Sequence, residues 1–567
     1  MKNISFLFCF LIVSTKLFSQ HDHHVDDDNA GHSHLAHMQA SRAKTVYIHN
    51  LPPPKLMPGV GKSAMKIETT SEKTQAYFNQ GLNLLHDFWD LEAYRAFKEA
   101  IRNDSNAVMP YFGLLQVPGS KEDSVLIEQR KLAVKQIKKL IKKANDHEKL
   151  YAEMALLGDS LKDKGYPELL KKYEVIVHKF PDDIDAKLML ALGKMSGYDN
   201  DLNPRDGTIY SEFLLKDVQR LDPQNHAFHH YWIHQMENCC PEQAVASADV
   251  LASLAPASGH IVHMPGHIYN RVGQYKKAHD AFVAAVKTDS AYMKNEGILE
   301  VDNWNYIHNI NYLIANCAHD GRYKEGLFYA EKLKKMPIMK ERKKIYDGTF
   351  FGQGIMAPAR MEMAFGHWDK AAAQLELIVD KDTVFNASNM NFRDGVLHFV
   401  KGMDAIANGK TDEAIKHSNS LDAFLWRNAW QAGKDSTMQE WYQEWLNIAS
   451  LELQGCVKSA QGKYDEAIRL LEKSQKGEIS LGYREPPAYP RPVAISLASA
   501  YEKAGKLDKS VAVYENVLKR FPGSGIGLAG LAKVYAKKGE ATKAKECEAK
   551  LKEVGKFGDK GVFVVAK

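Results

Sequence analysis

Small and aromatic residues recur at a fixed spacing along most of this 567-residue chain, and this recurrence limits the fold more than any other feature. One copy of the pattern, from Gly259 to Ser290, reads as two helices joined by a tight turn. Its small and aromatic positions are Gly266, Tyr269, Gly273, Tyr275, Ala278, Phe282 and Ala285. Two antiparallel helices cannot bury their apolar faces alone, so neighbouring copies must stack. We therefore expect an all-α protein.

Further copies follow the same frame, and Gly505 and Gly539 are separated by 34 residues. The positions in the other copies are Gly81, Ala93, Phe97 and Ala100, then Gly402, Gly409 and Ala414, then Gly455, Gly462, Tyr464 and Ala467, and finally Tyr501, Tyr514 and Tyr535. The pattern resembles the tetratricopeptide repeat (TPR). This resemblance implies a TPR-type α-α solenoid, a right-handed superhelix with a concave groove.

The first twenty residues resemble a cleaved secretory signal, with Lys2, an apolar run over residues 4–13 and a short polar tail. We therefore expect a periplasmic or secreted protein. No later apolar run reaches the ~18 residues that a membrane span needs. The predicted organisation is a signal peptide (1–20), a flexible His/Asp-rich and Pro-rich segment (21–63), an N-terminal TPR-like solenoid with a histidine-rich groove (64–335) and a C-terminal TPR solenoid (336–567).

The formal net charge of +5 falls to +3 without the signal, which carries Lys2 and Lys16 and no acidic residue. The other lysines are scattered along helix-like segments, so solvated helix faces explain them better than a nucleic-acid partner does. We predict no nucleic-acid partner. Because repeats of this kind usually serve binding, we predict a protein or peptide partner in the groove.

Histidines are concentrated in one part of the chain. Seven of the 23 lie within a window of 42 residues: His226, His229, His230, His234, His260, His263 and His267. In the TPR frame, these positions fall on the first helices of two consecutive repeats, and His308 falls on the next. Imidazoles one helical turn apart can share a metal ion, and Zn, Cu, Ni and Fe all accept nitrogen ligands. The alternative is that they are core residues bonded to backbone carbonyls.

The candidate metal ligands are His230, His234, Glu237, His260, His263, His267 and His308, which we expect to converge on a common ion (Zn, Cu or Fe). The TPR frame also places Asn270, Arg271 and Asn311 at groove-binding positions. Pro265 lacks a helix hydrogen bond and can mark the start of a helix, which would leave His260 and His263 on the preceding loop.

A second histidine group directly follows the predicted signal. Cleavage after Gln20 would create an amino terminus that begins His21-Asp22-His23, followed by His24. A free amine, two amides and the third-residue imidazole can form a square-planar Cu(II) or Ni(II) site. The alternative is a solvated tail, which the composition of this segment also predicts.

The strings HYWIHQME, GHIVHMPGHIYNRVGQY and YIHNINYL resemble motifs that occur in the same order in a family of bacterial TPR proteins. This resemblance names no reaction. The exported TPR architecture also resembles proteins encoded in polysaccharide-utilisation loci, such as those for ulvan. Three functions stay open. The first is a binding scaffold that has a metal site in its groove and an accessory role in such a system. The second is a metal-dependent hydrolase or oxygenase, and the third is a periplasmic metal storage or delivery protein. Whether the chain is an enzyme therefore stays open.

Overall fold

A computed structural model describes residues 51–117, 124–161, 166–199, 201–337, 350–379, 385–431, 440–482 and 487–563. The predicted signal peptide and the N-terminal candidates His21, His23 and His24 lie outside the described residues, so both remain predictions. No helix in the described part of the chain is long and apolar enough to cross a membrane.

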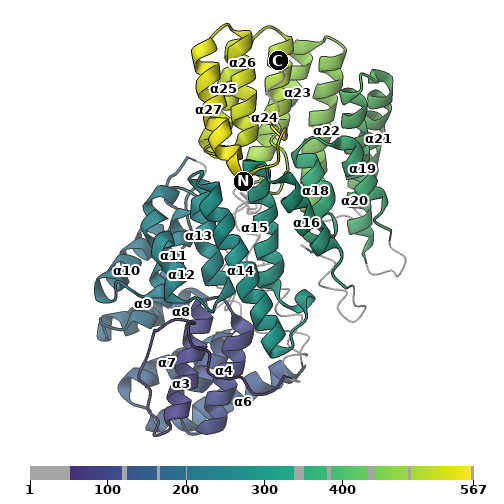
Figure 1. Ribbon diagram of the computed structural model, residues 1–567. Helices are drawn as coiled ribbons and strands as arrows, with labels where there is room; N and C mark the ends of the chain where they lie inside the picture. The colour runs from purple at the N-terminus through teal and green to yellow at the C-terminus, as the bar shows by residue number, and fades with distance from the viewer. Residues whose placement is uncertain are drawn as a thin grey trace, which may run out of the picture. The chain divides into compact units, whose positions relative to one another are not determined.

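The chain divides into two compact units, and the division falls inside helix α11 (His226–Met236), at Tyr231/Trp232 (Figure 1). The expected division at residues 335/336 stays a prediction. The other helices of the first unit are α3 (Glu72–His86), α4 (Asp90–Asn103), α5 (Met109–Gln116), α6 (Ser124–Leu140), η1 (Ile141–Lys143), α7 (Asp146–Leu161), α8 (Tyr166–Lys179), α9 (Ile184–Lys194) and α10 (Thr208–Leu221).

The second unit contains the rest of α11 and all later helices. These are η3 (Pro241–Ala244), α12 (Val245–Leu254), α13 (Gly259–Arg271), α14 (Tyr275–Glu296), η4 (Glu300–Asp302), α15 (Trp304–Asp320), α16 (Tyr323–Lys334), η6 (Phe351–Ile355), α18 (Ala357–Ala364), α19 (Trp368–Glu376), α20 (Ala387–Ala407), α21 (Thr411–Gln431), α22 (Glu440–Ala460), α23 (Tyr464–Ser480), α24 (Ala494–Lys503), α25 (Leu507–Arg520), α26 (Gly525–Lys537), α27 (Ala541–Val554) and η7 (Gly555–Phe557).

Consecutive helices pack as hairpins, and glycines lie where the two helices of a hairpin approach each other. A Cβ on Gly266 of α13 would lie 2.3 Å from the Phe282 ring of α14, and one on Gly81 would lie 2.6 Å from the Phe97 ring. Gly273 turns the chain between α13 and α14 with a φ of 76°, a conformation that costs glycine little. All regular elements among the described residues are helices, which confirms the predicted all-α, TPR-type α-α solenoid.

Helix α13 settles the question that Pro265 raised. It begins at Gly259, with Ser258 at the N-cap position, and runs through Pro265 to Arg271. Residues 259–269 of the helix, on both sides of Pro265, are all buried. Packing on both sides therefore keeps the helix continuous despite the hydrogen bond that a proline removes. His260 and His263 consequently lie on the helix and not on a preceding loop.

Within the second unit, the last repeats return to contact α13 and α15. The Nη1 of Arg271 donates to the carbonyl of Arg520 over 3.3 Å, and the His319 ring stacks on Phe521 with centroids 5.1 Å apart. Near the C-terminal end, the amide of Asp559 donates to the carbonyl of Gly321 over 2.8 Å. Helices α13 to α15 are therefore packed both by their neighbours in sequence and by repeats about 200 residues further along the chain.

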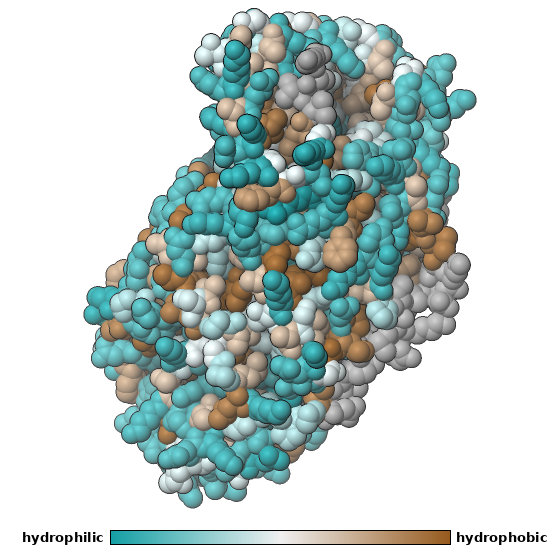
Figure 2. Space-filling view, viewed as in Figure 1, coloured by the Kyte–Doolittle hydropathy of each residue, from teal (hydrophilic) through white to brown (hydrophobic). Residues whose placement is uncertain are grey.

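In the view of Figure 2, hydrophilic residues cover most of the face, and hydrophobic ones form small patches between them. The most exposed aromatic side chains of the described residues, Phe213, Phe328 and Trp426, lie on three different helices. Scattered apolar residues of this kind are normal on a protein surface. The five cysteines of the described residues are all free.

Candidate functional site: buried histidine trios

Three buried histidines of the second unit come together between α13 and α15. His263 and His267 lie one turn apart on α13, and His308 lies on α15. Each offers one ring nitrogen, and these nitrogens lie within 4.8 Å of one another. None of the three side chains is more than 1% exposed. We call this group the inner trio.

The inner trio contains a close contact between two ring nitrogens. The Nε2 atoms of His263 and His267 are 2.6 Å apart. The Nδ1 of His267 lies 2.7 Å from Oε2 of Glu237. Since a carboxylate only accepts hydrogen bonds, this Nδ1 must carry a proton and donate it. A neutral His267 then presents a lone pair at Nε2, towards His263.

Glu237 also accepts from a second imidazole, because the Nδ1 of His234 lies 3.2 Å from its Oε1. Burial alone would raise the pKa of this carboxyl, but the electrostatic attraction and the hydrogen bonds of the His234 and His267 rings outweigh burial and hold the pKa well below its ordinary range. Glu237 is therefore ionised at neutral pH. One buried carboxylate thus fixes which ring nitrogen carries the proton in two histidines.

Aromatic rings enclose the inner trio. The Tyr312 ring lies one turn beyond His308 on α15, and its centroid is 4.4 to 4.6 Å from the centroids of all three imidazoles. Phe282 of α14 packs against His263, with centroids 5.0 Å apart. Tyr312 is not among the residues predicted from the sequence, although its position one turn after His308 was a usable signal. These rings give the trio a dry, low-dielectric surrounding, in which electrostatic interactions are strong.

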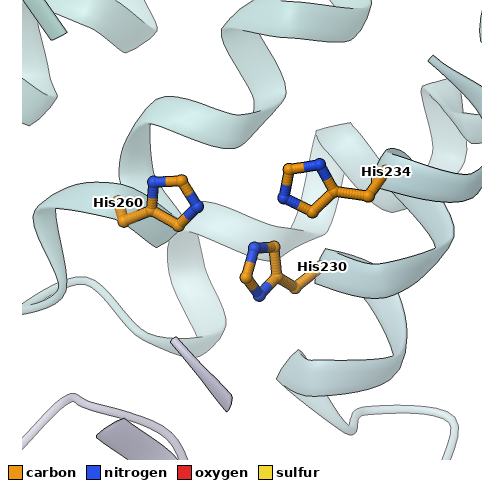
Figure 3. A group of neighbouring side chains, drawn as sticks. All are labelled: His230, His234 and His260. Atoms are coloured by element: carbon orange, nitrogen blue, oxygen red, sulfur yellow. The ribbon is translucent and has the colours of Figure 1, made fainter. Parts of the chain in front are cut away.

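A second trio consists of His230, His234 and His260, whose ring nitrogens also lie within 4.8 Å of one another. Figure 3 shows the three rings facing one another. His230 and His234 lie on α11, and this one continuous helix fixes their spacing. The Nδ1 of His230 donates to the backbone carbonyl of His86 over 2.8 Å, which leaves its Nε2 as an acceptor. Glu237 connects the trios through one histidine of each.

The structure divides the predicted ligands differently from the single cluster that the sequence suggested. The six histidines form two trios, so His230 does not share a group with His263, His267 and His308. All six are buried and none is more than 4% exposed, so they lie inside the helix packing and do not line an open groove. Glu237 lies beside both trios as a hydrogen-bond acceptor. Neither His226, which pairs with Asp87, nor His229 belongs to a trio.

The three predicted groove-binding residues have separate positions. Asn270 donates to the side chain of Asn316 over 2.9 Å. Arg271 donates to the backbone carbonyls of Glu237, Asn238 and Arg520. These hydrogen bonds stabilise the backbone beside the inner trio. Asn311 lines a separate pocket of the second unit.

A buried carboxyl near the start of α13 was missed by the sequence reasoning. Asp289 of α14 accepts from the side-chain amides of Asn305 and Asn309 on α15. Burial raises the pKa of Asp289 to about 7, although these amides act in the opposite direction. A Cβ on Gly259 would lie 2.1 Å from Oδ1 of Asp289, so a larger residue at this position would have to displace the carboxyl group. Asp289 therefore holds a titratable proton in the middle of the physiological range.

Comparison with known proteins supports the repeat type. Residues 495–549 match the tetratricopeptide repeat family. No curated protein matches the chain. Among solved structures, the human IFIT1 dimer with m7Gppp-AAAA is 14% identical and has a TM-score of 0.33, with 94% of this chain and 96% of that chain covered. Yeast Tom70 is 14% identical and has a TM-score of 0.28, with 85% and 89% covered. The repeat type therefore rests on the matched residues and on the helix pairs.

Proposed function

We propose that this chain is a TPR-type binding protein that holds a transition-metal ion on His263, His267 and His308. The observation that carries the proposal is the convergence of three buried ring nitrogens, from two helices, within 4.8 Å of one another. Histidine nitrogens at such a spacing suit Zn, Cu or Fe. The inner trio lies wholly within the second unit of the chain.

The hydrogen bond to Glu237 favours a metal site over an ordinary histidine core. A metal-bound histidine almost always donates its other ring N–H to a carboxylate or a carbonyl, and His267 does so at 2.7 Å. Two nitrogens bound to zinc at about 2.0–2.1 Å with tetrahedral angles are roughly 3.3 Å apart. The 2.6 Å contact between His263 and His267 would therefore have to open by about 0.7 Å. Small rotations of the two side chains could supply this.

The burial of the trio favours metal holding over turnover. Three histidines leave a coordination position open, as catalytic zinc sites do, and this is the feature that would suit a metal-dependent hydrolase or oxygenase. A substrate would, however, have to reach imidazoles that are no more than 1% exposed. A structural or stored ion therefore fits better. Storage or delivery would give His21, His23 and His24 a role in capturing the ion.

The proposed setting is outside the cytoplasm, and the rest of the solenoid would act as a platform for a protein or peptide partner. The signal-like first twenty residues motivate this location. An accessory role in a polysaccharide-utilisation system, of the ulvan type, belongs to the same proposal. Genes for sulfatases, lyases or glycoside hydrolases beside this one would support that role, and their absence would remove it.

Metal analysis of the purified full chain tests the proposal. The protein is loaded with Zn(II), Cu(II) or Fe(II), desalted and analysed for bound metal, with residues 21–37 removed in a second preparation so that the N-terminal histidines do not contribute. We expect about one tightly bound ion per chain, and its loss in the His263→Ala/His267→Ala double variant. The double variant His398→Ala/His417→Ala is the matched control, because these two rings are also neighbours, with centroids 5.9 Å apart.

Two results would count against the proposal. One is the absence of stoichiometric metal in the wild-type chain after loading with each ion. The other is equal metal content in the two double variants. A cobalt-substituted sample gives an independent reading, because nitrogen ligation changes its visible absorption spectrum.

A further inference from the structure

A pocket of the second unit lies apart from the histidine trios, where α15 and α18 meet the last repeats. The space between its lining atoms, open solvent included, amounts to about 810 Å³. Most of its lining is apolar, and includes Ile314, Met361, Tyr489, Val517, Phe521 and Ile526. Such a lining with few polar groups is typical of sites for small organic ligands.

One cationic side chain in this pocket has no acidic counterpart among the residues that the structure describes. The Arg360 guanidinium donates to the backbone carbonyls of Pro487 over 2.7 Å and Ala488 over 3.0 Å. No carboxylate among the described residues forms an ion pair with it. Burial lowers the pKa of Arg360 to about 10, so it still carries its charge at neutral pH. Two of its five N–H donors make these bonds, which leaves three for another acceptor.

The other ionisable groups of the pocket do not balance this charge. Glu478 is already paired with Arg520, over 2.9 Å, and its second oxygen accepts from the amide of Val493. Burial lowers the pKa of His319 to about 4, so this ring is neutral at physiological pH. Among the described residues, Arg360 therefore carries the unbalanced charge on a mostly apolar wall.

We propose that this pocket binds a small organic acid that carries one carboxylate on an apolar body. The carboxylate would meet the guanidinium of Arg360, whose planar donors match two carboxylate oxygens. The apolar body would lie against Met361, Phe521 and Ile526. The bound acid would supply the negative charge that the described lining of this pocket does not offer to Arg360.

Isothermal titration calorimetry of the full chain with matched ligands tests the inference. The probes are 4-phenylbutyrate, its primary amide and the corresponding amine, which share the apolar body and differ in charge. A charge-assisted hydrogen bond predicts at least about tenfold tighter binding of the acid than of the amide, and no detectable binding of the amine. A peptide with a free, apolar C-terminus is included, because a protein chain end carries the same groups.

Variants place the binding in this pocket. Arg360→Gln should remove the preference for the acid over the amide, whereas Arg393→Gln should keep it, because Arg393 also donates to a backbone carbonyl but lies outside the pocket. Ala318→Phe fills the pocket from α15 without changing a charge and should abolish binding of the acid. The unfolding temperature of each variant shows that it is folded.

Three results would overturn the inference: no binding of the acid at millimolar concentration, equal affinity for acid and amide, or an unchanged affinity in Arg360→Gln. Tight binding of the peptide without binding of the small acid would also overturn it and would assign the pocket to a protein partner. None of these outcomes depends on the metal content of the chain, so the two proposals can fail separately.

Discussion

Replacing Glu237 with glutamine is the sharpest perturbation of the inner trio. The carboxylate accepts one N–H from His267, over 2.7 Å, and one from His234, over 3.2 Å. A glutamine side chain offers one acceptor and one NH₂ donor, so it can accept from only one of the two imidazoles. If the NH₂ group faces His267, this ring has to carry its proton on Nε2, which then cannot bind a metal. If the amide oxygen faces His267, the hydrogen bond persists but loses the charge that strengthens it.

The expected loss of metal affinity in the glutamine variant can be estimated from comparable sites. Loss of a carboxylate that orients a metal-bound histidine typically weakens metal binding about 10- to 100-fold, equivalent to about 1.4 to 2.7 kcal/mol. Glu237 also affects stability. Because its pKa is held low in the folded state, the stabilisation is present above the ordinary pKa of a glutamate, about 4.3, and is lost as the pH falls further. The Glu237→Gln variant should lack this pH-dependent part of the free energy of unfolding.

Competition with a chelating dye at pH 7 measures the zinc affinity of wild type and variant. Glu362→Gln is the matched control, since Glu362 is also a buried carboxylate that accepts from a histidine, His367, over 2.9 Å, but lies outside both trios. We expect Glu362→Gln to keep the wild-type affinity. Equal zinc affinities in the Glu237→Gln and Glu362→Gln variants would refute the reasoning, because Glu237 would then have no part in orienting a ligand.

Two further predictions concern stability. Because Asp289 has a pKa of about 7 in the folded chain and about 3.9 when unfolded, the folded state holds the proton more tightly, and the free energy of unfolding should fall by roughly 3 kcal/mol as the pH rises from 4 to 7. Urea unfolding at several pH values measures this free energy, and the Asp289→Asn variant should not show the decline. An identical pH dependence in wild type and variant would contradict the prediction. Gly266→Ala places a methyl group 2.3 Å from the buried Phe282 ring. We expect the free energy of unfolding to fall by about 1 to 2 kcal/mol, since overpacking outweighs the gain in helix propensity. A higher urea midpoint for the variant than for wild type would contradict this prediction.

The repeat pattern predicted the helix pairs because its positions report local packing. Gly266 and Phe282 are spaced to meet across a hairpin, and Gly273 permits the turn between its helices. The behaviour of Pro265 could not be settled in this way. A proline removes one hydrogen bond wherever it stands, but whether the helix continues depends on how tightly distant residues pack on its flanks.

The sequence identified the histidines correctly as neighbours and could not give their grouping. Helical periodicity places His263 one turn from His267, but the distance to His308 depends on how closely α13 and α15 approach. The environment of Asp289 gave no sequence signal, because its partners lie 16 and 20 residues away on another helix. The pocket around Arg360 was hidden for the same reason, since its wall is assembled from residues 311 to 526.

The return of the last repeats to α13 and α15 changes how the second unit should come apart. In an open array of repeats, the end units fray first and stability is close to a sum over neighbours. Here the bonds from Arg271 to Arg520 and from Asp559 to Gly321 tie late repeats to early ones. Fraying at the C-terminal end must break these distant ties, so the second unit should melt in one cooperative step. Closing such long loops also makes assembly slow, because the chain entropy is lost before the contacts form.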